Sequence, residues 1–285
     1  MKVLRTIEAA ALACGRLREL SMRRKFMREL ATLGLPRGPG SDVNIAPIAD
    51  EDLEPLPEPA RRYLRFMGVV GLPRDWSFRL GFKGRFRRSR DEAWMKCEAW
   101  QYSTRLALAR IFHIQLRFFG VVPVLGRDTY LDGRGRMLIR LMDLVTVGDG
   151  TGEAYDIGEL VTYLNDGIML APSMLLVPEV SWTEVDATSF GVALTDHGRT
   201  VSARVFTDER GAPMDFETTD RFYAKDPARV TRCRWTTPME GFREIGGRML
   251  PTRGQAVWHP AEGEFAYADF ALEPTRVVFN VAPGE

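Results

Sequence analysis

The sequence predicts a mainly β protein of the α+β class, in which a large curved antiparallel sheet forms a half barrel around one helical insert. Many short segments alternate apolar and polar residues, which is the period of a half-buried strand. One strongly apolar segment within residues 156–178 interrupts these strands and is too apolar to lie in water. Because the apolar face of a sheet must cover something, we expect the sheet to wrap around this segment.

The composition indicates one large hydrophobic core and argues against several functions. Of the 285 residues, 45% are hydrophobic, and β folds of this size are often a single domain. The net charge of +1 gives the protein no overall field that would attract nucleic acid, so no nucleic-acid partner is expected. Cys14, Cys97 and Cys233 are odd in number and lack the CxxC spacing, which argues against a disulfide framework and a zinc cluster.

Residues 1–34 predict a basic amphipathic helix ahead of the main domain. Eight bases and three acids give this segment a net charge of 8 − 3 = +5. Such a helix can lie on an anionic membrane surface or pack on the protein's own sheet, and the sequence favours neither. Its first apolar positions recur at steps of three and four residues, at Val3, Ile7, Ala10, Cys14 and Leu17.

The expected location is cytoplasmic, with peripheral contact at the inner membrane as a further expectation. Arg5 and Glu8 interrupt the apolar stretch that a secretory signal would need. No window of about 18 uncharged apolar residues is present, so no membrane-spanning helix is predicted. A linker rich in proline and glycine is expected at residues 35–55, and the main domain at residues 56–285.

The main domain is predicted to begin with a short helix and to continue as strands. Prolines in a first turn, followed by good helix formers, predict a helix over Leu56–Phe66. In Trp76–Arg87 apolar and polar residues alternate, which predicts a half-buried strand. Glycine-bearing polar connections between many of the runs indicate antiparallel hairpins. Further alternating runs predict strands at Ala93–Tyr102, Leu106–Phe118, Met137–Val147, Phe190–Leu194, Val201–Val205, Met214–Thr218, Val230–Trp235, Gln255–Trp258, Phe265–Leu272 and Arg276–Asn280.

The helical insert is predicted at residues 156–178. Asp156 stands where an N-cap is expected, and Glu159 follows three residues later, as in a capping box. Apolar residues at helical spacing then continue to Asn165. Residues 167–178 contain glycine and two prolines, so we expect them to be buried but not to extend the same helix.

Acidic and aromatic residues at strand ends and on the insert form a candidate catalytic set. If the helix faces a cavity, buried carboxylates there would have raised pKa values and could exchange protons with a ligand. The alternative is structural, with Glu159 capping the helix and Asp128 pairing with an arginine such as Arg221. The candidate catalytic residues are Asp128, Tyr130, Glu159, Tyr163 and Asp166.

Candidate ligand-binding residues are expected around the same cavity. The tryptophans among them fit a core or a cavity wall better than a cofactor platform. No Gly-x-Ser-x-Gly elbow accompanies Ser173, although its setting is apolar. The candidate ligand-binding residues are Met169, Pro172, Ser173, Trp182, Arg221, Trp235 and Trp258.

Other charged and polar patterns favour structural roles. Bases recur along one predicted strand at Arg79, Lys83, Arg85 and Arg87. They could meet phosphate headgroups or an anionic ligand, but a solvated outer sheet face is the better interpretation. The three histidines lie far apart in the sequence, and the glycine-rich segments lack the Lys-Ser/Thr pair of a phosphate loop, so no metal or cofactor is expected.

Several separated motifs resemble an uncharacterised bacterial family of unknown function over residues 55–280. Many members carry an arginine before the tyrosine of the insert helix, where this chain has Thr162, so no role of that arginine carries over. The family is similar in architecture to LolA/LolB-like lipoprotein carriers, half barrels with a helical lid that hold acyl chains, which implies a fold and not a function. The motifs are Leu56-Pro57-Glu58-Pro59 with Arg62-Tyr63-Leu64, Gly126-Arg127-Asp128-Thr129-Tyr130 with Gly133, Gly135 and Met137, and Gly158-Glu159-Leu160 with Tyr163-Leu164-Asn165-Asp166 and Ala171-Pro172-Ser173.

The leading functional hypothesis is a binding or carrier protein that holds an apolar or amphiphilic small molecule or lipid in a half-barrel cavity. The alternative is an enzyme, namely an isomerase, cyclase or hydrolase acting on a hydrophobic substrate, with the carboxylates and tyrosines above as acid–base residues. A third hypothesis, a scaffold at a membrane surface, depends on residues 1–34. The sequence does not decide whether any reaction is catalysed.

Overall fold

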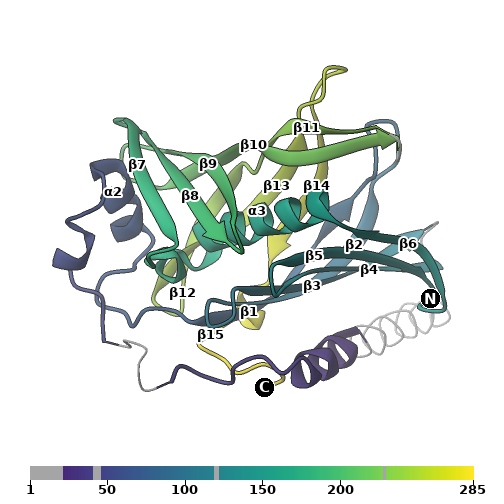
Figure 1. Ribbon diagram of the computed structural model, residues 1–285, viewed down its shortest axis with the longest axis horizontal. Helices are drawn as coiled ribbons and strands as arrows, with labels where there is room; N and C mark the ends of the chain where they lie inside the picture. Colours follow the sequence, from purple (N-terminus) through teal and green to yellow (C-terminus); the bar gives the residue numbers. More distant parts are fainter. Residues whose placement is uncertain (1–21, 41–45, 119–121, 227–228) are drawn as a thin grey trace, which may run out of the picture.

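One long antiparallel sheet curves around helix α3 (Glu153–Leu170), which lies between strands β1–β6 and the limb formed by β7–β11 (Figure 1). The computed structural model describes residues 22–40, 46–118, 122–226 and 229–285. The strand order is β6-β5-β4-β3-β2-β1-β14-β13-β11-β10-β9-β8-β7, with β12 paired to β13 and β15 paired to β1. No ladder joins β6 to β7 in the described chain. The predicted open half barrel is therefore confirmed.

The sheet consists almost entirely of sequential antiparallel strands. Besides α3, the structure has helix α2 (Glu58–Phe66) and the 3-10 helix η2 (Pro172–Leu175), with η1 at Glu51–Leu53 and η3 at Pro274–Arg276. The strands are β1 (Ser77–Phe86), β2 (Met95–Thr104), β3 (Ala109–Phe118), β4 (Val122–Leu131), β5 (Arg134–Leu141), β6 (Val145–Thr151), β7 (Val180–Asp186), β8 (Ser189–Asp196), β9 (Arg199–Thr207), β10 (Pro213–Asp226), β11 (Arg229–Thr236), β12 (Met239–Ile245), β13 (Arg248–Trp258), β14 (Phe265–Leu272) and β15 (Val278–Phe279).

The predicted run Met137–Val147 is a hairpin and not one strand. Met142 and Asp143 both have positive φ, at 50° and 61°, and the backbone N–H of Leu144 donates to the carbonyl of Leu141 at 3.0 Å. These are the features of a type I′ turn, which reverses the chain between β5 and β6. The prediction of one continuous strand was wrong, because this turn lacks the usual Asn-Gly or Asp-Gly signature.

Helix α3 begins three residues earlier than predicted. Its N-cap is Gly152, and Asp156 lies inside the helix, where its carboxylate accepts a hydrogen bond from the Gly135 backbone N–H at 2.8 Å. The predicted cap at Asp156 is therefore wrong, because a strand competes for that carboxylate. The helix continues through Gly167, where a Cβ would lie 2.9 Å from the side chain of Leu175. Glycine is needed there so that η2 can pack on α3.

The apolar insert forms the centre of the main core. Ile168, Leu170, Met174 and Leu175 are buried among residues of the surrounding strands. The hydroxyl of Tyr63 in α2 donates to the carbonyl of Ile168 at 2.7 Å. Burial of this segment inside the curve of the sheet agrees with the sequence prediction, since no other face of the fold can cover so much apolar surface.

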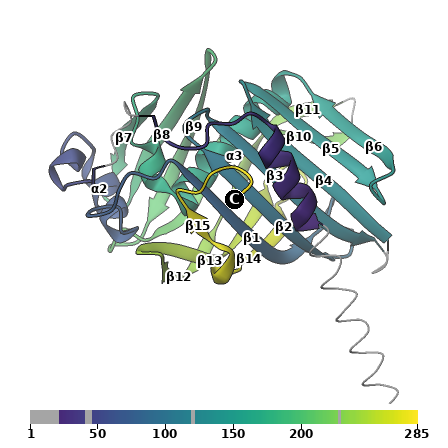
Figure 2. The same ribbon diagram turned by 90° about the horizontal axis from the view of Figure 1, so that it is seen from below.

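The N-terminal helical segment, residues 22–32, packs across the outer face of the sheet over β3 and β4 (Figure 2). Phe26 and Leu30 are fully buried there, and the ring of Phe26 lies 5.3 Å from that of His113. The carboxylate of Glu29 pairs with His113 and Arg127. The predicted apolar stripe from Val3 to Leu17 lies outside the described residues.

The predicted basic row of β1 lies on the outer face of the sheet. Lys83 pairs with Glu273 and Arg85 pairs with Asp269, whereas Arg79 is buried beneath the segment 22–32. Two of the four bases in the row are therefore paired with acids of the protein, and a third is buried and not solvated.

Candidate functional site

A buried polar cluster lies on the inner face of the sheet, against α3. Arg110 of β3 donates through Nε to Oδ2 of Asp166 at 2.6 Å and through Nη1 to Oε2 of Glu159 at 3.0 Å. Gln101 of β2 donates a further hydrogen bond to Asp166 at 2.7 Å. Residues of one strand that differ by two point to the same face, so Phe112 follows Arg110 onto the inner face. We call these polar residues, together with Asp128, the inner cluster.

Asp128 of β4 belongs to this cluster because it stands opposite Phe112 in the β3–β4 ladder. Its carboxyl group is only partly exposed, and burial raises its pKa despite the nearby positive charges of Arg110 and Arg221. Burial likewise raises the pKa of Glu159 to about 7; Arg110 opposes this shift, and the negative charge of Asp128 adds to it. The cluster thus holds one carboxyl group that titrates near neutral pH.

Aromatic side chains of β11, β13 and β14, together with Arg221 of β10, form a wall beside the inner cluster. The guanidinium of Arg221 lies 4.4 Å from the ring of Trp235 and 5.5 Å from that of Trp258. Arg221 also donates to the hydroxyl of Thr162 on α3 at 3.0 Å. The rings of Trp258 and Tyr267 stack with centroids 5.9 Å apart. Cation–π contacts of this kind hold Arg221 in place between the sheet and the helix.

An apolar patch extends from this wall along the inner faces of β1–β4 and β14. It is a second cluster that meets the main core at Phe82, and no residue of α3 belongs to it. The rings of Phe82 and Phe270 stack at 5.7 Å, and Phe112 lies 6.4 Å from Phe270. Five of its side chains are only half-buried, and we call the whole set the inner patch: Cys97, Ala99, Phe112, Ile114 and Leu116 with Phe82, Phe86, Met95, Val124 and Phe270.

The two tyrosines of the candidate catalytic set are not hydrogen-bonded to the inner cluster. The Tyr130 hydroxyl donates to Oδ2 of Asp196 at 2.6 Å, and that of Tyr163 donates to the carbonyl of Thr104 at 3.3 Å. Burial raises the pKa of both phenols. Of the five candidates, Asp128, Glu159 and Asp166 are therefore brought together, and the tyrosines serve the core.

Most of the candidate ligand-binding residues from the insert also have structural roles. Ser173 donates to Oδ2 of Asp75 at 2.8 Å, and Asp75 is paired with Arg248. Pro172 is buried, and the thioether of Met169 accepts a hydrogen bond from Asn165 at 3.4 Å.

Trp182 lies elsewhere in the fold than the other two tryptophans. It packs against Tyr63 and Phe190, next to α2. Only Arg221, Trp235 and Trp258 of the proposed ligand-binding residues stand beside the inner cluster.

Sequence reasoning missed Arg110, Gln101 and Tyr267. Arg110 interrupts an apolar run on a predicted strand, and a charge on an apolar face was the one available signal. The predicted cap by Glu159 is wrong, because its carboxylate is paired with Arg110 at the middle of the helix. In the described chain no three His, Cys, Asp or Glu side chains are grouped as metal ligands.

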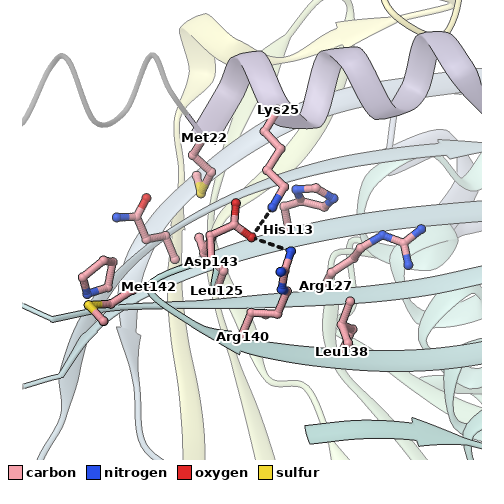
Figure 3. Close-up of a pocket in the computed structure, with 12 residues that line it drawn as sticks. Met22, Lys25, His113, Leu125, Arg127, Leu138, Arg140, Met142 and Asp143 are labelled. Atoms are coloured by element: carbon pink, nitrogen blue, oxygen red, sulfur yellow. Dashed lines mark hydrogen bonds and ion pairs between the residues drawn. The ribbon is translucent and has the colours of Figure 1, made fainter. Parts of the chain in front are cut away.

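A pocket of about 360 Å³ lies on the opposite, outer face of the sheet, beside the start of the segment 22–32 (Figure 3). Leu125 and Leu138 form its floor, and Met22 and Met142 stand at its sides. The carboxylate of Asp143 pairs there with both Lys25 and Arg140. No sequence pattern indicates this pocket, because it is formed by a helix and a hairpin more than 100 residues apart.

Comparison with known proteins places the chain in a family. Two solved structures are similar: a LolA superfamily protein of Nitrosomonas europaea, at 16% identity over 80% of this chain and 92% of that one, and a domain described as an outer-membrane lipoprotein-sorting protein of Vibrio parahaemolyticus, at 8% identity over 72% and 85%. The TM-score is 0.41 for each. No curated protein matches the sequence. Among the described residues no helix has the length and apolarity to cross a membrane. A family model matches residues 46–270, and the chain therefore belongs to the family of unknown function DUF6544.

Proposed function

We propose that the protein binds an apolar or amphiphilic small molecule against the inner face of its sheet. The observation that carries this proposal is the inner patch, an apolar surface inside the curve of the sheet that α3 does not cover. Half-buried Phe82, Phe86 and Phe270 leave apolar area in contact with water, which costs about 25 cal/mol per Å². Contiguous concave apolar surface of this kind is typical of ligand sites.

The inner cluster would meet the polar end of such a molecule. Counted together with Arg221 of the adjacent wall, the inner cluster has two guanidinium groups and three carboxyl groups, and its net charge when fully ionised is 2 − 3 = −1. The raised pKa of Glu159 means that a proton neutralises this charge in part at neutral pH. A bound polar group that donates hydrogen bonds or carries positive charge would also compensate the negative charge of the carboxylates.

Binding can be tested with the fluorescent apolar probe N-phenyl-1-naphthylamine. We expect saturable binding to the wild-type protein and a loss of affinity of about tenfold in Phe270→Ala, since a buried phenyl ring contributes about 1.5–3 kcal/mol. Native mass spectrometry of the purified protein would show any molecule that is retained.

A matched control is Phe242→Ala. Phe242 is also a half-buried aromatic residue and packs on Phe66 with ring centroids 5.2 Å apart, but it lies outside the inner patch. This variant should bind the probe as the wild type does. Absence of saturable binding to the wild type, or equal affinity of the Phe270 variant, would contradict the proposal.

Acid–base chemistry on a bound apolar substrate is a second candidate, favoured by the pKa of about 7 at Glu159. The partner of Glu159 would be Asp128 or Asp166 and not a tyrosine, because Tyr130 and Tyr163 are hydrogen-bonded elsewhere. Turnover of a bound molecule that survives unchanged in a folded Glu159→Gln variant would eliminate this candidate.

A further inference from the structure

Exposed apolar side chains gather at the tip of the β5–β6 hairpin. Of the ten large hydrophobic residues that are exposed in the described chain, four lie between positions 142 and 147. Leu144 is 74% exposed and Val147 is 59% exposed. We call this set the hairpin tip: Met142, Leu144, Val145 and Val147. Clustered exposure of this kind indicates a surface that meets an apolar partner.

The turn at the hairpin tip holds a bulky residue in an unfavourable conformation. Met142 has a φ of 50°, in the left-handed region that glycine and asparagine normally occupy. A Met-Asp pair in a type I′ turn costs stability that Asn-Gly would not. Strain of this kind persists where the residue serves another purpose, here the exposure of a thioether at the tip.

A helical segment with exposed basic side chains lies beside the hairpin tip. The segment 22–32 buries its apolar face against the sheet and leaves four bases exposed to solvent: Arg23, Arg24, Lys25 and Arg28. Lys25 bridges directly to Asp143 in the turn, so the basic helix and the hairpin tip lie side by side. The one acid of that helix, Glu29, faces the sheet, where it is hydrogen-bonded to His113 and forms an ion pair with Arg127.

The pocket under the helix continues the same surface inward. Met142 belongs both to the hairpin tip and to the lining of the pocket, whose other apolar residues include Leu125 and Leu138 (Figure 3). Apolar side chains flanked by cations, with an apolar recess behind them, match the chemistry of an anionic lipid surface, where phosphate groups lie next to acyl chains.

We propose that the hairpin tip and the basic face of the segment 22–32 dock together on an anionic lipid bilayer. A second copy of this chain would bring the same positive charge to the contact, which disfavours self-association there. The apolar face of the segment 22–32 is occupied by the sheet, so the segment contributes charge and the hairpin contributes apolar contact. This docking is a property separate from the binding of a small molecule on the inner face.

Vesicle sedimentation tests the proposal directly. The full chain should sediment with vesicles of phosphatidylcholine and phosphatidylglycerol, sediment weakly with phosphatidylcholine alone, and lose binding as salt is raised. The double variant Leu144→Asp/Val147→Asp should lose at least about tenfold in affinity, the loss expected when a single large apolar side chain is kept from the bilayer. Arg24→Glu/Arg28→Glu should abolish the preference for the anionic lipid.

Two matched controls keep the outcome specific. Val185→Asp changes a side chain that is 47% exposed on β7, and Arg243→Glu/Arg253→Glu reverses two exposed bases on β12 and β13. Both should bind vesicles as the wild type does, and thermal unfolding should show that every variant is folded. The proposal would be overturned if the wild-type protein did not sediment with anionic vesicles, or if the hairpin-tip variants bound them with unchanged affinity. The proposal would also be overturned if mutation of the hairpin tip changed the self-association of the protein but not its binding to vesicles.

Discussion

Arg110 and Glu159 form an ion pair inside the curve of the sheet, with Nη1 and Oε2 3.0 Å apart and side chains only 6% and 4% exposed. The same guanidinium also serves Asp166, and Asp128 lies close enough to repel Glu159. Arg110 therefore pairs with two carboxylates, and its single positive charge cannot neutralise both. Burial is the main reason why the pKa of Glu159 rises although the residue has a salt-bridge partner, and the negative charges of Asp128 and Asp166 add to the shift.

Glu159 should make the stability of the protein fall as pH rises. Its pKa in the folded state is about 7 against an ordinary value of 4.5. Its stabilising effect is therefore fully present below about pH 4.5 and is lost as pH rises through about 7, by up to roughly 3 kcal/mol. Urea unfolding of Glu159→Gln should show a smaller loss between mildly acidic and mildly basic pH. Equal slopes for variant and wild type would contradict this assignment.

Removal of Arg110 should destabilise the fold severely. Arg110→Met leaves Glu159 and Asp166 buried without their cation, and loss of one partner of a buried pair costs about 3–5 kcal/mol. Arg136→Ala is the control, because its pair with Asp149 is 45% and 41% exposed and should contribute less than about 1 kcal/mol. Chemical unfolding of the two variants at neutral pH measures the difference.

The inner cluster should discriminate between amphiphiles by headgroup charge. Dodecylamine should displace N-phenyl-1-naphthylamine several-fold more tightly than laurate, because the cluster of Arg110, Arg221 and three carboxyl groups has a net charge of −1 when ionised. The preference should increase as pH rises through about 7, where Glu159 loses its proton. Tighter binding of laurate at every pH would show that the carboxylates do not meet the headgroup.

The packing of the segment 22–32 on the outer face of the sheet should weaken in acid. Pairing with His113 and Arg127 outweighs burial and lowers the pKa of Glu29 from 4.5 to about 2. The stabilisation from Glu29 is therefore present above about pH 4.5 and is lost as pH falls towards 2. Trypsin should cleave Glu29→Gln faster at Arg24 or Arg28 than the wild type at neutral pH. Identical cleavage rates would argue against a docking role for this carboxylate.

The sequence predicted the architecture because period-two alternation is local. The run Trp76–Arg87 contains β1 with an error of only one residue at each end. Three strands were missed, β4, β7 and β12. Two of them have a physical reason, because β7 and β12 are mostly exposed on both faces. Strands that bury few side chains leave no alternation in the sequence.

The site was predicted only in part, because it depends on contacts across the chain. Asp128, Glu159, Asp166 and Arg221 were singled out as candidates, and the structure brings them together. Arg110 was not, since it lies 49 and 56 positions from its two partners and only the folded sheet brings them together. The motif residue Gly135 also depends on a contact that only the folded chain makes. A Cβ at this position would lie 2.1 Å from the carbonyl oxygen of Tyr155 in α3, so no larger residue fits there.

The gap between β6 and β7 means that backbone pairing does not fix the width of the half barrel. No ladder joins those two edges in the described chain, so no backbone hydrogen bond between β6 and β7 sets the distance between the two limbs. A closed barrel has a diameter fixed by strand number and stagger, whereas here side chains hold the two limbs together: the Tyr130 hydroxyl donates to Asp196 at 2.6 Å, and Arg199 donates to the carbonyl of Gly133 at 3.1 Å. The width of the half barrel therefore depends on a few side-chain contacts, which single substitutions can remove without changing the strand order.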